Sequence, residues 1–174
     1  MELLTRLCRR LDNLVSRAAV KLVNDATSLQ SMQVSMLAGE VRDGCERVQN
    51  YGFTSVPLLG AEGVVVFVGG YRDHPLVVAV DDRRYRLKAL QPGEVAIYTD
   101  QGDRIVLKRG GAIEVVASSS LTITSPQVTI SGTLTVNGDI SVPTGDVHAG
   151  AIHLKTHKHT GVTTGGGVSG VPTP

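Results

Sequence analysis

A three-residue unit of apolar, small polar and apolar residues recurs in the second half of the chain and limits how it can fold. The units are LTI at 121–123, VTI at 128–130, LTV at 134–136, ISV at 140–142 and IHL at 152–154. From Val128 onward the first residues fall on a period of six or its double, and Asp146 occupies the missing step. Such units predict very short strands with apolar side chains on one face and Ser, Thr or His on the other.

A single row of these strands cannot bury its own apolar face. The segment has no aromatic residue that could cover it, and its strand edges would be open. Stacked coils within one chain, as in hexapeptide-repeat acyltransferases, are one solution, but this repeat would give only about two coils. Three identical chains wound around one axis would bury the face with a short repeat, because each apolar position is then present three times. The repeat therefore favours a trimer.

The composition changes abruptly at Gly110. From Gly110 to Leu154 there is no Lys or Arg, and the acidic residues there are Glu114, Asp139 and Asp146. Over the whole chain, aromatic residues make up 3% against 20 glycines, which suits thin β layers better than one thick core. The formal net charge of +1 gives no argument for a nucleic-acid or acidic-membrane partner.

Residues 26–110 contain short β-like runs separated by Gly, Asp and Pro turn signals. These runs are MQVSML, TSVPLL, GVVVFVGG, PLVVAV, EVAIYTD and RIVLKRG. Five or six short strands in a segment of this length predict a small antiparallel barrel of the oligonucleotide/oligosaccharide-binding (OB) type, and a small sandwich also fits.

Barrels of the OB type often bind single-stranded nucleic acid through stacked aromatic side chains, so this function is an alternative. The candidate side chains are those of Tyr51, Phe53, Tyr71, Tyr85 and Tyr98. Aromatic residues are so scarce here that we expect them to form the core and rim of the barrel instead. The basic cluster DDRRYRLK is also neutralised in part by its own two aspartates.

Residues 1–25 show helical periodicity. Their apolar residues are spaced three and four apart, at Leu4, Leu7, Leu11, Leu14 and Ala18. The spacing predicts an N-terminal helix that either lies on its own domain or associates with other copies or partners. About three heptads are too few to choose between these roles.

The segment THKHTG near the C-terminus contains a candidate metal motif. In an extended segment His157 and His159 project to the same face. One chain then supplies two imidazoles, and a zinc site would have to recruit His148 and His153. No acidic residue follows Asp146, which argues against a cupin-type metal enzyme. Solvent-exposed histidines on a flexible tail are the other alternative.

A threefold assembly changes the chemistry available to this motif. Three copies of His157 and His159 would provide six imidazole nitrogens around one axis. This octahedral set suits iron(II) or another six-coordinate transition metal better than tetrahedral zinc. All six positions are then filled by protein, so we expect the metal to be structural.

The order of these parts resembles the central spike, or baseplate assembly protein V, of contractile-tailed phages, and the Mu-type spike in particular. The segments that carry the resemblance are YGFTSVPLLGAEG at 51–63, GGYRDHPLVVAV at 69–80, DRRYRLKALQPGEVAIYTDQGDRI at 82–105 and THKHTG at 156–161. These segments extend over most of the chain. Both their local sequences and their order along the chain resemble those of the family.

The resemblance implies a homotrimer whose barrel binds baseplate hub proteins and whose needle is driven through the host outer membrane when the tail sheath contracts. It implies one Fe²⁺ ion per trimer, held by His157 and His159 of each chain. It implies a location at the tip of the virion tail baseplate, after synthesis in the host cytoplasm. Some relatives insert a lysozyme domain between barrel and needle, but Asp103 to Ile113 leaves no room for one. We therefore expect mechanical puncture, neither enzymatic activity nor a nucleic-acid partner.

The sequence thus predicts a mainly β protein with four parts. These are an N-terminal α-helix at 1–25, an OB-like antiparallel barrel at 26–110, an intertwined trimeric β-helix at 111–155 and a metal-binding apex at 156–174.

Overall fold

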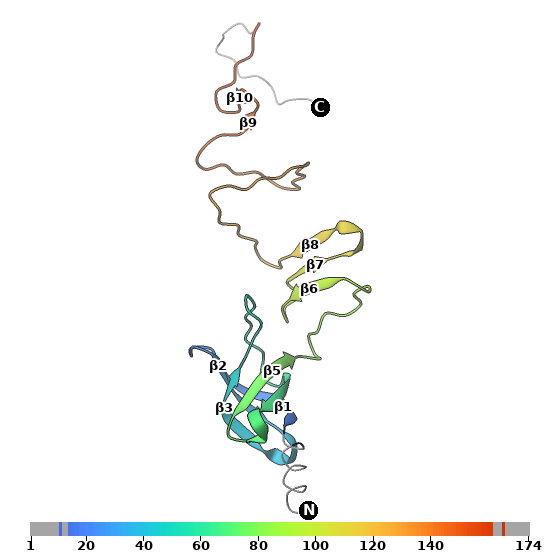
Figure 1. The fold of residues 1–174 in the computed structure, drawn as a ribbon. Helices are drawn as coiled ribbons and strands as arrows, with labels where there is room; N and C mark the ends of the chain where they lie inside the picture. Colours follow the sequence, from blue (N-terminus) through green and yellow to red (C-terminus); the bar gives the residue numbers. More distant parts are fainter. Residues whose placement is uncertain (1–10, 12–13, 162–164, 166–174) are drawn as a thin grey trace, which may run out of the picture. The chain divides into compact units, whose positions relative to one another are not determined.

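Five strands close into a barrel in the first half of the chain (Figure 1). The computed structural model describes residue 11, residues 14–161 and residue 165. The barrel strands are β1 (Val15–Asn24), β2 (Gln30–Ser35), β3 (Val41–Arg47), β4 (Glu62–Phe67) and β5 (Pro75–Asp81). Their order around the barrel is β1, β2, β3, β5, β4, with β3 and β5 parallel and the other neighbours antiparallel. The expectation of a small closed barrel is confirmed.

The barrel interior is filled by one side of each strand. Burial alternates residue by residue along β2 and β4, as expected for strands with one face toward a core. The largest fully buried side chains are those of Phe67, Met32, Val20, Val34, Val65, Val77 and Cys45. Burying each of the large apolar side chains stabilises the fold by about 1.5–3 kcal/mol. Burial also raises the pKa of the Cys45 thiol.

The predicted N-terminal helix is wrong from residue 15 onward, because these residues form strand β1. β1 pairs with both β2 and β4, so its backbone groups are satisfied by neighbouring strands. Ala18 and Val20, two residues apart, enter the core, while a register shift after Val20 leaves Leu22 exposed. Apolar residues spaced three and four apart can thus also fit an irregular strand. Residues 1–10, 12 and 13 lie outside the described residues.

The barrel also ends earlier than predicted, at Asp81 and not near residue 110. The run TSVPLL was expected to be a strand, but it lies in the loop between β3 and β4. Its Pro57 has no N–H to donate to a strand partner. Instead, side chains bind the loop backbone: Arg47 Nη1 donates to the Ser55 carbonyl at 2.6 Å, and Arg84 Nη2 donates to the Leu59 carbonyl at 2.8 Å.

The runs EVAIYTD and RIVLKRG belong to a separate antiparallel sheet. Its strands are β6 (Val95–Tyr98), β7 (Arg104–Leu107) and β8 (Ile113–Val116), in the order β6, β7, β8. The predicted boundary at Gly110 therefore falls inside this sheet, because β7 and β8 pair on either side of it. Gly110 has a φ of +78° within the connecting turn, a conformation that favours glycine.

The chain divides into two compact units, residues 1–122 and 123–174. In the second unit, β9 (His148–Ala149) pairs with β10 (Ile152–His153), while the repeat units at 128–142 are not assigned to strands. Three single 3₁₀ turns complete the described elements: η1 (Leu37–Gly39), η2 (Val68–Gly70) and η3 (Arg109–Gly111). No helix in the described part of the chain is long and apolar enough to span a bilayer. The trimeric β-helix stays a prediction.

Candidate functional site

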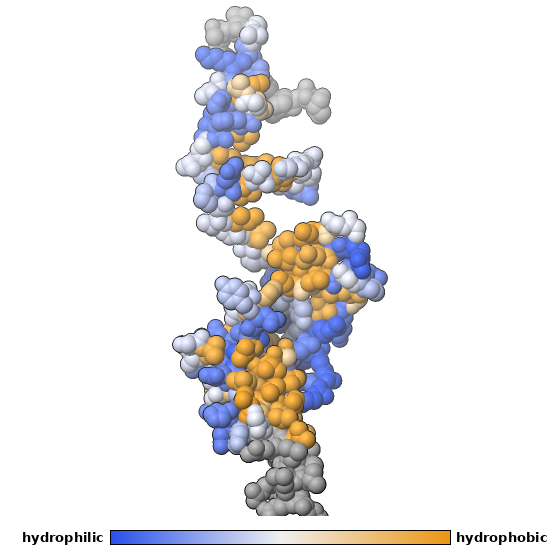
Figure 2. Space-filling model, in the orientation of Figure 1, coloured by the Kyte–Doolittle hydropathy of each residue, from blue (hydrophilic) through white to orange (hydrophobic). Residues whose placement is uncertain are grey.

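One face of the β6–β8 sheet is apolar and open. The register aligns two rows of side chains across the three strands, so that all six lie on the same face. The rows are Val95, Leu107 and Ile113, and Ile97, Ile105 and Val115. These residues are 42% to 68% exposed, and Figure 2 shows hydrophobic side chains gathered over these strands. Three strands of four residues need such a face covered to be stable.

On the opposite face of this sheet, charged side chains form ion pairs with one another. Arg104 Nη2 lies 2.8 Å from Glu114 Oε1, and Lys108 contacts the other carboxylate oxygen. The hydrogen bonds from Lys108 and Arg104 lower the pKa of Glu114. Val106 on the same face is buried. The sheet is therefore amphipathic, with an exposed apolar face and a charged face.

The apolar residues of the repeat are open as well. They are 37% to 67% exposed, and they are Leu121, Ile123, Val128, Ile130, Leu134, Val136, Ile140 and Val142. Between residues 119 and 145, all of which the structure describes, no backbone N–H donates to a backbone carbonyl. A single chain thus leaves the apolar side chains of this segment open and its backbone without strand partners. This result contradicts closure into stacked coils within one chain.

The two histidines of THKHTG lie next to each other, as their spacing predicts. The ring centroids of His157 and His159 are 5.0 Å apart with the planes nearly perpendicular. His157 Nδ1 lies 2.9 Å from the carbonyl oxygen of Leu154. If Nδ1 carries the proton and donates it to this oxygen, Nε2 is left as the free ligand atom, an arrangement common in metal-binding histidines. Metal binding by this pair stays a prediction.

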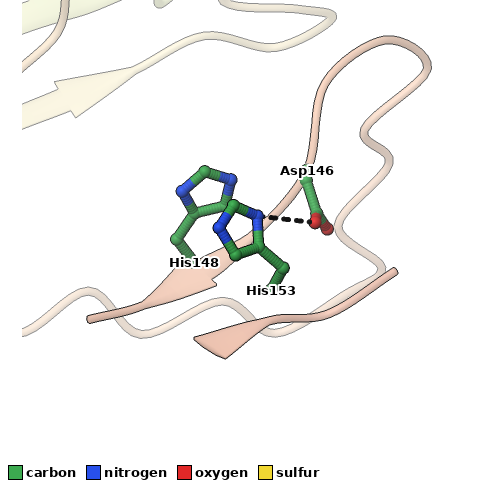
Figure 3. A group of neighbouring side chains, drawn as sticks. All are labelled: Asp146, His148 and His153. Carbon is green, nitrogen blue, oxygen red and sulfur yellow. Dashed lines mark ion pairs between the residues drawn. The ribbon is translucent and has the colours of Figure 1, made fainter. Parts of the chain in front are cut away.

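A second group of ligand side chains lies just before this motif (Figure 3). The side chains of Asp146, His148 and His153 each offer one ligand atom, and these atoms lie within 4.8 Å of one another. His153 Nδ1 is 3.4 Å from Asp146 Oδ2, and the two imidazole centroids are 3.9 Å apart. The group combines one carboxylate with two imidazoles, which is a donor set for divalent transition metals.

The hairpin of β9 and β10 positions this group. His148 and His153 are directly paired across the two strands, so their side chains share one face. Gly150 has a φ of +61° at the first position of the two-residue turn, where tight hairpins often require glycine. From the sequence, the two histidines were expected only as ligands that a zinc site would have to recruit, and Asp146 was not expected as their partner. The Asp-x-His spacing followed by a glycine turn could have indicated it.

The five aromatic residues considered for base stacking are exposed by 38% or more, so the expectation that they help form the core is wrong. Phe67 is the buried aromatic of the barrel. The nearby basic cluster is partly neutralised, as expected. Arg84 pairs with Asp82 at 2.6 Å and Arg83 pairs with Glu62 at 2.7 Å. The hydrogen bond from Arg84 lowers the pKa of Asp82.

Comparison with known proteins agrees with the resemblance in the sequence. The family described as Bacteriophage Mu Gp45, N-terminal, matches residues 17–84, which include most of β1 and all of β2 to β5. The baseplate puncturing device gp45 of Escherichia phage Mu is 41% identical over 147 residues, covering 80% of this chain and 75% of that protein.

A second relative extends the match over more of both chains. The Mu-like prophage FluMu protein gp45 of Haemophilus influenzae (strain ATCC 51907 / DSM 11121 / KW20 / Rd) is 38% identical over 164 residues, covering 87% of this chain and 88% of that protein. Identity at this level over most of the length indicates a common fold and a common architecture beyond the barrel. The chain belongs to the bacteriophage Mu Gp45 family of Mu-type baseplate spike proteins.

Proposed function

We propose that three copies of this chain form the central spike of a contractile phage tail and that the spike pierces the host outer membrane when the sheath contracts. The description of the phage Mu relative as a baseplate puncturing device supports this role. The barrel binds baseplate hub proteins, and the protein acts mechanically, without catalysis. It is made in the host cytoplasm and acts at the tip of the virion tail.

The exposed apolar residues of the repeat carry this proposal. The six-residue apolar face of the β6–β8 sheet is a second, separate open surface. Rows of exposed apolar side chains of this kind are typical of interfaces. Further copies are the occupant that fits best, because each copy brings the same repeat at the same spacing and the same unpaired backbone. Pairing between copies would bury the apolar side chains and give the backbone groups strand partners.

The histidine pair fits a structural metal at the end of such a trimer. His157 and His159 from three chains would supply six imidazole nitrogens to one Fe²⁺ ion, leaving no position for substrate or water. The adjacent rings and the bond of His157 to the Leu154 carbonyl support this assignment, because both hold ligand atoms in place before metal binds. The metal would hold three chain ends together and supply no reaction step.

The mass of the purified full-length protein tests the proposal. We expect a particle of three times the 18.3 kDa chain mass by light scattering, with about one iron per three chains by elemental analysis. A monomer at micromolar concentration would contradict the trimer. Single-strand binding that weakens steeply with salt would instead favour the nucleic-acid function.

Replacing both histidines separates the metal from the assembly. We expect the double variant His157→Ala, His159→Ala to lose iron but remain a trimer, because the apolar layers of the repeat are unchanged. Lys158→Ala, between the two histidines, is the matched control and should keep both iron and trimer. Loss of the trimer in the double variant would mean that the metal, and not the apolar repeat, holds the chains together.

A further inference from the structure

The group of Asp146, His148 and His153 is a separate candidate for metal binding, because all of its members come from one chain. Figure 3 shows the two imidazoles side by side on the paired strands, with the carboxylate approaching His153. The histidines of the THKHTG motif need two further chains to complete a site, whereas this group needs none. It also has one carboxylate oxygen in its donor set, which the six-imidazole site lacks.

The aspartate is held in position by the backbone. Its Oδ1 accepts the N–H of Val147 at 2.8 Å and the N–H of Lys155 at 3.1 Å. The side chain of Asp146 is only 14% exposed. These bonds occupy one oxygen and direct the other, Oδ2, toward His153. Pre-positioning of a carboxylate by hydrogen bonds to its second oxygen is the arrangement expected around a metal ligand.

The spacing of the donors agrees with a tetrahedral ion. Ligands bound to zinc at about 2.0–2.2 Å in tetrahedral geometry lie about 3.3–3.6 Å from each other. The distance of 3.4 Å between His153 Nδ1 and Asp146 Oδ2 falls in this range. It is longer than the 2.7–3.2 Å of an ordinary N–H···O hydrogen bond. The third donor, on His148, lies within 4.8 Å of the other two and can reach the ion by side-chain rotation.

We propose that Asp146, His148 and His153 bind one divalent zinc-class ion per chain, with a water molecule at the fourth position. The ion connects β9, β10 and the segment before them. Because each of these strands is only two residues long, the hairpin alone is marginal, and an ion bound to its folded form stabilises it. The site is complete in a single chain and does not depend on the trimer or on iron at the apex.

Zinc titration of the full-length protein tests the site in a background that lacks the apex histidines. After removal of bound metal, we expect the His157→Ala, His159→Ala variant to bind about one Zn²⁺ per chain in isothermal titration. Adding His148→Ala and His153→Ala should abolish this binding. Absence of zinc binding in the first variant, or unchanged binding in the second, would overturn the proposal.

Asp146→Asn gives a milder test, because its amide oxygen still accepts the backbone N–H bonds. Loss of a partner outside the ligand set costs about 10–100-fold in metal affinity, so loss of a ligand oxygen should raise the zinc Kd at least about 100-fold. Asp139→Asn, an exposed aspartate in the same unit, is the matched control and should leave Kd unchanged.

X-ray absorption at the zinc edge of the apex variant should report two imidazole ligands per ion. Equal zinc affinity in the Asp146→Asn and Asp139→Asn variants would overturn the assignment of Asp146.

Discussion

Replacing Ile140 with serine tests whether the open repeat is an interface between copies. Ile140 is 67% exposed in the single chain. Full burial of an isoleucine is worth about 1.5–3 kcal/mol, so covering the exposed two-thirds is worth about 1–2 kcal/mol per chain. Three copies lose about 3–6 kcal/mol, which raises the dissociation constant of the trimer by about 10²- to 10⁴-fold. The serine hydroxyl adds a further cost if it is buried without a hydrogen bond.

Sedimentation equilibrium over a dilution series measures this change directly. Ser141→Ala is the matched control, because strand alternation would place its side chain on the opposite face of the same unit. This change should leave the dissociation constant within about tenfold. The barrel is distant in sequence and should unfold at the same temperature in both variants. If Ile140→Ser dissociates at the same concentration as the wild type, the apolar residues of the repeat do not hold the chains together.

Three further changes test the barrel. Phe67→Ala should lower the free energy of unfolding, measured in urea, by about 3–5 kcal/mol because the side chain is fully buried. Val78 is half-exposed, so Val78→Ala should lower it by about 0.5 kcal/mol. Equal losses in the two variants would mean that Phe67 is not part of the core. Gln30→Leu should lower the free energy of unfolding by about 1–3 kcal/mol, because buried Gln30 accepts a hydrogen bond from Arg47 at 2.9 Å. An unchanged free energy of unfolding would mean that this bond does not stabilise the barrel. The hydrogen bond from Arg72 lowers the pKa of Glu40, so this carboxylate stabilises the fold above its unfolded pKa of about 4.3. That stability is lost as pH falls through the lower folded pKa, so Tm should fall more steeply on acidification in the wild type than in Glu40→Gln, and parallel curves would contradict the assignment.

The barrel could be predicted only in part, because its strands differ in how clearly their sequences indicate a strand. GVVVFVGG and PLVVAV are β-branched and bounded by turn residues, and both form barrel strands. β1 has apolar residues at spacings that fit a helix equally well, and its pairing with two neighbouring strands decides the outcome. TSVPLL is apolar enough for a strand, yet a proline and side-chain donors from Arg47 and Arg84 keep it in a loop.

The candidate sites also differ in how far they could be predicted from the sequence. The adjacency of His157 and His159 follows from their spacing alone, and their rings lie side by side. The group at Asp146 depends on a hairpin of two-residue strands, too short to give a periodic signal in the sequence. The open face of the β6–β8 sheet was also missed. Its register aligns residues of two runs that were expected in the barrel with residues of the segment 111–155, which was expected to form the β-helix.

The two units depend on assembly to different extents. The barrel has a closed ring of strand pairs and a buried core within one chain, so its folding requires no partner. Residues 119–145 have no internal backbone hydrogen bonds, and their apolar side chains are open. Each ordered residue in such a segment costs about 1–2 kcal/mol of backbone entropy, which contacts within the chain do not offset. Under the proposed trimer, folding of this segment and association of the chains are therefore one equilibrium, and its midpoint must shift with protein concentration while that of the barrel does not.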